Sequence, residues 1–166
     1  MKKGFTLIEI LIVILIIGVL AGISLGQYQR VKDKAATRKL LVPLKAIMEA
    51  QRRFYTANNK QYAENLDDLD VNFSNFTGDC KLPFPVLSYC RSNGDVSIFY
   101  QPSTREIGVF FNEGKYQYSG LEWRTFHNYI ECYDLRKNKM CEEIFRCTLT
   151  QGGGNSSDNY YSCPNL

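Results

Sequence analysis

The sequence predicts an α+β protein in which a long N-terminal α-helix packs on an antiparallel β-sheet and a disulfide-rich C-terminal region follows. Three observations predict this fold class. A long apolar segment near the N-terminus continues into a charged segment whose apolar residues recur at helical spacing. Runs of β-branched and aromatic residues, separated by turn residues, follow in the second half of the chain. All six cysteines lie at or beyond residue 80.

The apolar segment covers residues 5–25, and it carries no polar side chain between Ile10 and Ile23. A helix of about 21 residues is long enough to cross roughly 30 Å of hydrocarbon. Lys2 and Lys3 precede it, which predicts a cytoplasmic N-terminus and export of the remainder. A cleaved secretory signal, a plain membrane anchor and a buried core helix are the alternatives, and the absence of an A-x-A pattern disfavours the first.

One acidic residue, Glu9, lies inside the first turns of this apolar segment. A carboxylate in a helix that partitions into hydrocarbon is costly unless another group pairs with it, so such a residue is by default functional. The sequence therefore predicts that Glu9 has a specific partner. A plain anchor leaves this residue unexplained.

Beyond Gly26 the chain becomes amphipathic, with apolar residues at near-helical spacing as far as Tyr55. The simplest interpretation is one helix from residue 5 to about residue 56, whose apolar half protrudes and whose second half packs on a domain. Pro43 should kink this helix. Gly26 weakens it by roughly 1 kcal/mol relative to alanine, so residues 22–26 are a candidate for a melted stretch.

The region after residue 71 is expected to be rich in β-structure. Strands are predicted at residues 95–101, 105–112 and 115–120, forming an antiparallel meander of three or four strands across the second half of the helix. A short helix is predicted at residues 140–145. Residues 151–159 are rich in glycine, serine and asparagine and are expected to form a loop tied down by Cys147 and Cys163.

The six cysteines predict disulfides formed in an oxidising compartment. No C-x-x-C motif occurs and His127 is the single histidine, so no metal site is expected. Six cysteines allow fifteen pairings, and spacing alone does not choose among them. The prolines between Cys80 and Cys90 favour a local bridge there, with the other four cysteines stapling the C-terminal region. The candidates are Cys80, Cys90, Cys132, Cys141, Cys147 and Cys163.

No catalytic constellation is visible: His127 has no evident partner for nucleophilic catalysis and no G-x-S-x-G motif is present. The chain is therefore not expected to be an enzyme or to need a cofactor. Its formal net charge is +3, and this near-neutral balance does not call for a nucleic-acid partner.

The N-terminal sequence G-F-T-L-I-E, fused to an uninterrupted apolar helix, resembles the signature shared by type IV pilins and type II secretion pseudopilins. The resemblance implies cleavage between Gly4 and Phe5 by a prepilin peptidase and N-methylation of Phe5. Glu9 would then meet the new amine of Phe5 on a neighbouring copy in a staggered packing of helices. A looser similarity continues over residues 50–71. The chain departs from many pilins in carrying Gly26 where they have proline.

This resemblance implies a type IV pilin fold and a division into a leader at residues 1–4, an apolar helix at 5–26 and a β-rich domain with the amphipathic helix half at 27–166. It also implies a structural subunit that waits in the inner membrane and then joins an extracellular pilus. The implied partners are further copies of the chain, an assembly platform protein and a cytoplasmic ATPase. The alternatives are a pseudopilin of a periplasmic type II pseudopilus and a minor pilin with an adhesive or DNA-uptake role.

Overall fold

The computed structural model of the chain describes residues 6–82, 89–126, 129–135, 138–152, 159–164 and 166. These residues divide into two compact units, residues 1–36 and residues 37–166, and each is described by itself. The leader and the cleavage site expected at Gly4 and Phe5, together with His127, lie outside the described residues.

The secondary structure consists of one long helix, short helical turns and seven strands. The elements in chain order are α1 (Leu7–Ala57), the 3-10 turn η1 (Leu66–Asp68), β1 (Tyr89–Ser92), β2 (Val96–Gln101), β3 (Glu106–Phe111), β4 (Gly120–Arg124), β5 (Ile130–Asp134), α2 (Met140–Glu143), β6 (Thr148–Gly152) and β7 (Asn159–Cys163).

Helix α1 confirms the single long helix predicted from the periodicity of the sequence. It continues through Pro43, and residues 22–26, where a melted stretch was expected, are helical in this structure. In the first unit, the large apolar side chains that the structure describes are exposed. The apolar residues there, which are mediocre helix formers in water, form a helix whose backbone hydrogen bonds are all internal, as a hydrocarbon environment requires.

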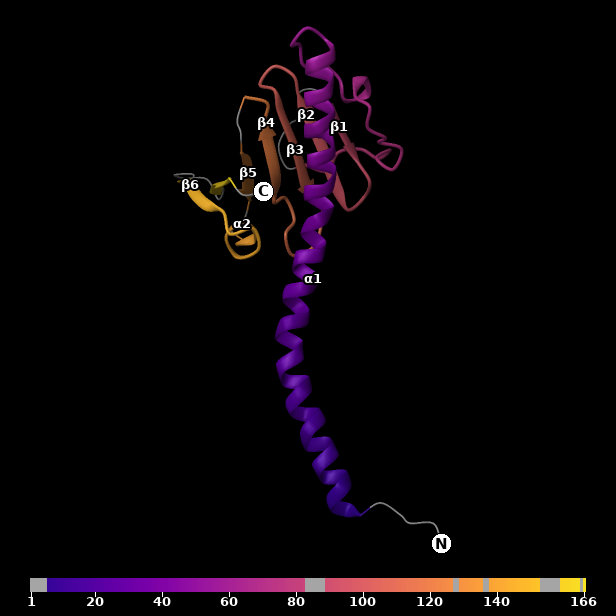
Figure 1. Ribbon diagram of the computed structural model, residues 1–166, viewed down its shortest axis with the longest axis vertical. Coiled ribbons are helices and arrows are strands. Elements are labelled where there is room, and N and C mark those ends of the chain that lie inside the picture. The colour runs from indigo at the N-terminus through magenta and orange to yellow at the C-terminus, as the bar shows by residue number, and fades with distance from the viewer. Residues whose placement is uncertain (1–5, 83–88, 127–128, 136–137, 153–158, 165) are drawn as a thin grey trace. The chain divides into compact units, whose positions relative to one another are not determined.

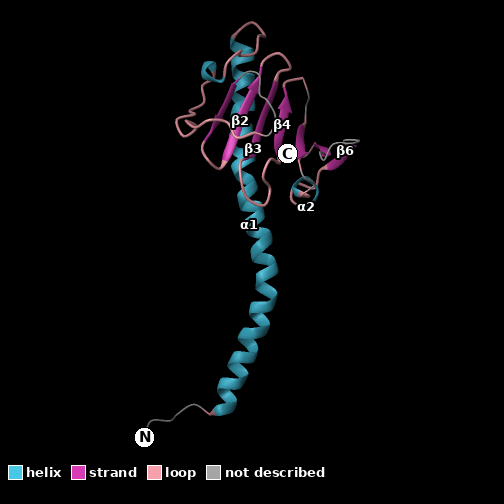
Figure 2. Ribbon diagram, turned by 180° about the vertical axis from the view of Figure 1, so that it is seen from behind, coloured by secondary structure: helices cyan, strands magenta, loops and turns pink. Residues whose placement is uncertain are grey.

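All seven strands form one antiparallel sheet with the order β1-β2-β3-β4-β5-β7-β6 (Figures 1 and 2). The prediction of three or four strands was therefore too low. The first five strands follow one another as a meander, as expected. The last two break the sequence order, because β7 lies between β5 and β6.

The strand predicted at residues 115–120 is wrong, since residues 115–119 lie in the turn between β3 and β4 and only Gly120 belongs to a strand. Alternating tyrosines suggested a strand, but Tyr116 packs against Phe111 with ring centroids 6.3 Å apart. Tyr118 adopts a positive φ of 64°, which a strand does not contain. Its backbone N–H donates to the carbonyl of Phe111 and closes the turn.

One face of the sheet packs on the second half of α1 (Figure 1). On the helix side, Leu40, Leu44 and Ile47 are fully buried, at the i, i+4, i+7 spacing of one helical stripe. On the sheet side, Trp123 faces the helix, with the guanidinium of Arg52 5.9 Å from its ring centroid. Hydrophobic burial along this stripe fixes which residues of α1 remain exposed.

The opposite face of the sheet is covered by aromatic rings instead of a helix. The ring of Phe99 lies 5.7 Å from that of Phe110, which lies 5.7 Å from Tyr133, which in turn lies 4.2 Å from Tyr160. Gly108 lies beneath this row, since a Cβ atom there would come within 2.2 Å of the Phe99 ring. The rings of Phe99 and Phe110 therefore lie close over a strand position that has no side chain.

Gly120 has the same function at the start of β4, and replacing it by alanine is expected to destabilise the domain by about 1–3 kcal/mol. A Cβ atom at this position would lie 2.4 Å from the carbonyl oxygen of Val109 and 2.6 Å from the Phe110 ring. Thermal unfolding of the purified chain in detergent measures the loss. Gly78→Ala is the matched control, because its nearest neighbour, the Ser92 carbonyl, lies 3.3 Å away. Equal melting temperatures for the two variants would contradict the close packing at Gly120.

Candidate assembly site in the N-terminal helix

Glu9 lies in the first turn of α1 and is held by the residue that precedes the helix. Both the backbone N–H and the hydroxyl of Thr6 donate hydrogen bonds to Oε2 of Glu9, each at 2.7 Å. The backbone N–H of Glu9 lies 3.4 Å from the Thr6 hydroxyl oxygen. This reciprocal arrangement is a capping box, which satisfies backbone donors that the start of a helix leaves free.

The capping box gives Glu9 a local function that was not predicted from the sequence. The signal was present as T-x-x-E directly before an apolar run, which is a known helix-start pattern. A carboxylate at this end of a helix is also stabilised by the positive end of the helix dipole. Thr6 is therefore a site residue that was not predicted from the sequence.

The side chains around Glu9 form an apolar surface that is exposed in the part of the chain that the structure describes. In this first unit, large hydrophobic residues are exposed on every side of the helix. They are Leu7, Ile8, Ile10, Leu11, Ile12, Val13, Ile14, Leu15, Ile16, Ile17, Val19 and Leu20. By length and composition, α1 is apolar enough to cross a membrane. Such a surface needs either lipid or other helices to cover it.

The expected pairing of Glu9 with the amine of Phe5 stays a prediction, because Gly4 and Phe5 lie outside the described residues. What the structure describes is the starting state of Glu9, with its carboxylate bound to Thr6 of the same chain. A pairing with another copy would therefore replace or share these local hydrogen bonds.

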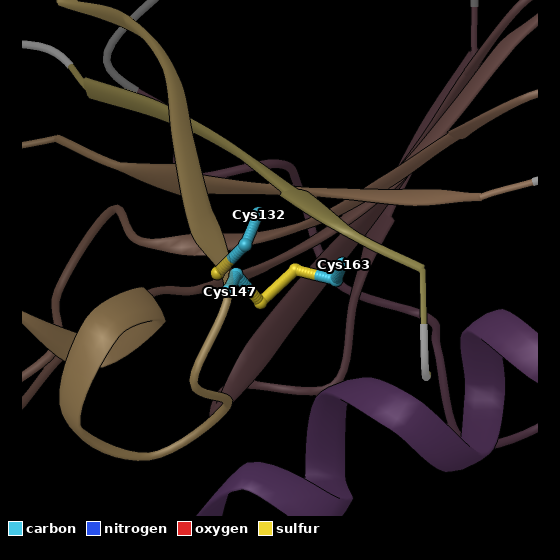
Figure 3. A group of neighbouring side chains, drawn as sticks. All are labelled: Cys132, Cys147 and Cys163. Atoms are coloured by element: carbon cyan, nitrogen blue, oxygen red, sulfur yellow. A yellow bond between two sulfur atoms is a disulfide. The ribbon is translucent and has the colours of Figure 1, made fainter.

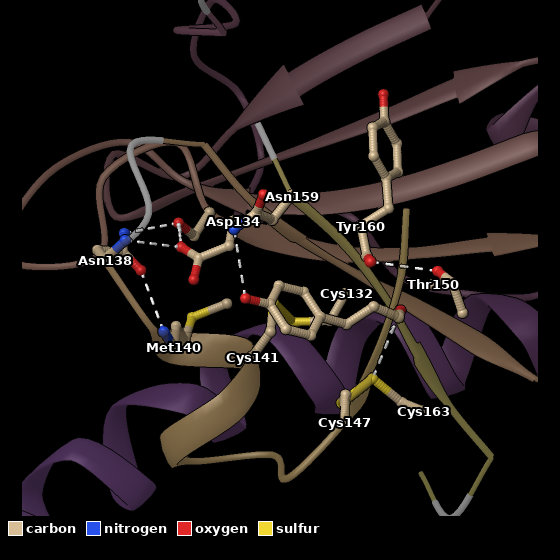
Figure 4. Close-up of a disulfide and its surroundings, with 12 residues drawn as sticks. Cys132, Asp134, Asn138, Met140, Cys141, Cys147, Thr150, Asn159, Tyr160 and Cys163 are labelled. Atoms are coloured by element: carbon tan, nitrogen blue, oxygen red, sulfur yellow. Dashed lines mark hydrogen bonds between the residues drawn. A yellow bond between two sulfur atoms is a disulfide. The ribbon is translucent and has the colours of Figure 1, made fainter. Parts of the chain in front are cut away.

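The six cysteines form three disulfides in the domain. Cys80 is bonded to Cys90, which is the local bridge expected from the sequence. Cys132 is bonded to Cys141, and Cys147 to Cys163, so four cysteines staple the C-terminal region (Figure 4). The first of these two bridges holds α2 against β5, and the second ties the start of β6 to the end of β7.

The sulfur atoms of Cys132, Cys147 and Cys163 all lie within 4.8 Å of one another (Figure 3). Their spacing would suit a metal ion, and they are buried. All three are already bonded in disulfides, however, so none offers the free thiolate that a metal requires. The cluster is therefore two disulfides in contact.

A second buried polar cluster lies on the aromatic face of the sheet, where Arg124 contacts three carboxylates. Its guanidinium nitrogens lie 2.7 Å from Glu106, 3.4 Å from Glu122 and 3.5 Å from Glu131. Glu122 is only 6% exposed, and burial, together with the charge of Glu106, raises its pKa to about 7. Arg124 opposes this shift but does not cancel it, because it is shared among three acids. Among the described residues, Oε1 of Glu122 has no hydrogen-bond partner.

Comparison with known proteins supports the interpretation of the N-terminal helix. The family described as the prokaryotic N-terminal methylation motif matches residues 1–25. The first 25 residues of the chain are therefore similar to the N-terminal segment of prepilins. The chain is 34% identical over 109 residues to the type IV major pilin protein PilA of Myxococcus xanthus (strain DK1622). It is 51% identical over 45 residues to fimbrial protein Q of Moraxella bovis.

These similarities cover part of each protein. The match to the Myxococcus pilin spans 55% of this chain and 49% of the relative. The match to the Moraxella fimbrial protein spans 27% of the chain and 29% of the relative. The chain thus spans half or less of the curated relatives it matches, and no solved structure matches it. The long N-terminal helix, the antiparallel sheet and the disulfides in the C-terminal region of this chain match an α+β pilin fold.

Proposed function

We propose that this chain is a structural subunit of a type IV pilus. The observation that carries the proposal is one carboxylate, Glu9, capped at the start of a helix whose surrounding side chains are apolar and exposed. Hydrocarbon or neighbouring helices have to cover that surface, and Glu9 then needs a cationic partner. The prepilin motif over residues 1–25 supports a source for that cation.

The cation is the amine created when the peptide bond between Gly4 and Phe5 is cut. Methylation of the Phe5 nitrogen keeps this amine basic. When helices pack side by side, Glu9 of one copy pairs with the amine of the next, and the pairing sets the stagger between them. An ion pair in such an apolar surrounding specifies register more than it adds stability, because both charges lose hydration.

The subunit would be held in the inner membrane by α1 until assembly and would then enter an extracellular filament of many copies. A prepilin peptidase, an assembly platform and an ATPase would process and assemble it. In this function the chain is a building block and not an enzyme. Packing among other helices keeps the apolar side chains of the first unit away from water once the subunit has left the membrane.

Replacing Glu9 by glutamine is expected to abolish filament assembly while leaving cleavage of residues 1–4 intact. Glutamine keeps the shape of the side chain and can still accept from Thr6, but it leaves the Phe5 amine buried without a counter-charge. Breaking a buried ion pair in this way costs roughly 3–5 kcal/mol, a factor of at least about 100 in an assembly equilibrium. Filaments sheared from the cell surface, compared with total subunit, give the measurement.

Thr6→Ser is the matched control, because serine keeps the hydroxyl of the capping box and should leave assembly near the wild-type level. Mass spectrometry of the N-terminal peptide should show the loss of residues 1–4 and the gain of one methyl group on Phe5. Wild-type filament yield from the Glu9→Gln chain would contradict the pairing of Glu9 with the Phe5 amine. If the wild-type cell carries no surface fibres and deletion of the chain abolishes protein secretion, the chain is a pseudopilin instead.

A further inference from the structure

The second half of α1 presents a charged face that the domain does not cover. Arg38, Val42, Lys45 and Glu49 recur at spacings of three and four residues and are all exposed. They lie on the side of the helix opposite the buried stripe that packs on the sheet. Basic residues outnumber acidic ones on this face by two to one, so it is a positive surface.

Two cations on this face are not used within the subunit. Neighbouring cations are used: Lys39 donates to Asp95 at 2.7 Å, and Arg53 makes a bidentate ion pair with an aspartate of the loop after the helix. Arg38 and Lys45, by contrast, make no side-chain hydrogen bond or ion pair in the part of the chain that the structure describes. Their charges are therefore available to a partner.

The complementary charges lie on α2. Glu142 and Glu143 are adjacent, exposed, and without a side-chain hydrogen bond or ion pair among the described residues. The disulfide from Cys132 to Cys141 fixes the position of α2 directly before this pair (Figure 4). The two carboxylates are thus presented on a rigid support, although neither is needed for the fold.

We infer that the basic face of α1, through Arg38 and Lys45, binds the acidic pair Glu142 and Glu143 of an adjacent copy. This inference rests on the proposed filament and names one contact within it. The two surfaces are different parts of one chain, so a contact between copies leaves one of each surface unused. Such a head-to-tail contact permits further addition and builds an open filament when the rotation between copies does not close a ring.

The charges would act through repetition, because every copy in a filament makes the same contact. A single exposed ion pair contributes little, since water and salt screen it. Reversing one side replaces attraction by repulsion at each contact along the filament. The contact should therefore be sensitive to ionic strength, and its loss should be repaired by reversing the other side as well.

Charge reversal in the full chain tests the inference. The R38E/K45E chain and the E142K/E143K chain are each expected to yield about tenfold less sheared filament per total subunit than wild type. The chain carrying all four substitutions should recover to within about threefold of wild type, because opposite charges again face each other. Failure of the four-substitution chain to recover, or unchanged yields from both double variants, would overturn the inference.

Glu113→Lys and Lys60→Glu are the matched controls, since both residues are exposed and lie outside the two surfaces. Neither substitution should change the yield more than about twofold. A loss in R38E/K45E alone, without recovery, would indicate that the basic face binds anionic lipid headgroups, and it would overturn the contact between copies. The Glu9→Gln chain tests a separate idea: its normal assembly would overturn the pairing of Glu9 with the Phe5 amine, and the charge reversals would still decide the contact between copies. A wild-type cell without surface fibres that contain this chain would overturn the proposed filament itself.

A second measurement does not depend on filament yield. A carbodiimide joins a lysine amine to a carboxylate in direct contact, so wild-type filaments should give a dimer on a denaturing gel with a Lys45 peptide joined to one containing Glu142 or Glu143. Lys45→Arg keeps the charge and should keep the filaments, but it has no amine to couple and should lose this dimer. Filaments that give no such joined peptide would overturn the inference.

Discussion

A chain in which Cys132 and Cys141 are both replaced by alanine is expected to lose about 3 kcal/mol of unfolding free energy from the disulfide alone. The two cysteines are nine residues apart, and the bridge restricts the unfolded chain by closing that loop. Both are fully buried beside the second bridge, so their removal also leaves a small cavity. A total loss of about 4 kcal/mol or more is a large part of the stability of a small domain.

The pair Cys80 and Cys90 provides the matched control, since it closes a loop of nearly the same length, ten residues, but is only half-buried. If chain entropy alone decides, the two double-alanine variants will lose equal stability. If packing contributes, the Cys132 and Cys141 variant will melt at the lower temperature. Thermal unfolding of the full chain in detergent gives both values, and a smaller loss at the buried pair would contradict the packing argument.

Replacing Glu122 by glutamine is expected to stabilise the domain at pH 8 by up to about 3 kcal/mol. The pKa of this carboxyl is raised from 4.5 to about 7 in the folded protein, chiefly by burial. Between these two values the folded state binds more protons than the unfolded state. The free energy of unfolding therefore falls as the pH rises from about 4.5 to about 7 and stays at its lower value above that.

Glutamine keeps the shape of Glu122 but removes this titration, so the variant's stability should change less with pH across that window. Burial also raises the pKa of Asp134, which acts in the same direction in both proteins and cancels in the difference between them. Denaturant unfolding at pH 5 and pH 8 measures the effect. Glu113→Gln, on an exposed side chain, should follow wild type at both values. Parallel pH dependence in wild type and Glu122→Gln would contradict the buried, perturbed carboxyl.

Helix α1 was predictable because two signals, the apolar run and the amphipathic stripe that follows it, together cover its whole length. The apolar run and the amphipathic stripe ending near Tyr55 share one period, and the observed end at Ala57 lies within a residue of the expected one. The helix was predicted to continue past Pro43, and it does. The helical state of residues 22–26 shows that glycine weakens a helix without forbidding it.

The C-terminal half of the sheet was not predicted, although its pattern was present. In β5 the residues Ile130, Cys132 and Asp134 are buried and alternate with half-buried ones, which is the period of a strand. Cysteine and aspartate are not typical core strand residues, so the alternation did not stand out. Asp134 is buried because its carboxylate accepts hydrogen bonds from Ser119 and from the backbone of Asn138. That role depends on tertiary contacts which sequence patterns do not contain.

Of the candidate site, Glu9 was predictable, because a single acidic residue in an apolar run is evident from the sequence alone. The T-x-x-E pattern also predicts the cap by Thr6, but Glu9 was interpreted only as a residue that pairs with another group. The buried cluster around Arg124 could not be predicted, because it joins residues of three strands whose register is set by the sheet.

Strand β7 lies between β5 and β6 in the sheet but follows both of them in the chain. A polypeptide that emerges N-terminus first presents both flanking strands before the one that joins them. Until β7 has emerged, Cys147 is a free thiol, because its partner Cys163 lies in β7. In the final fold the sulfur of Cys147 is also close to that of Cys132. Oxidation before β7 emerges can therefore join Cys147 to Cys132, which is not its native partner. An oxidoreductase that reshuffles such mispaired bridges should speed the formation of the native disulfides.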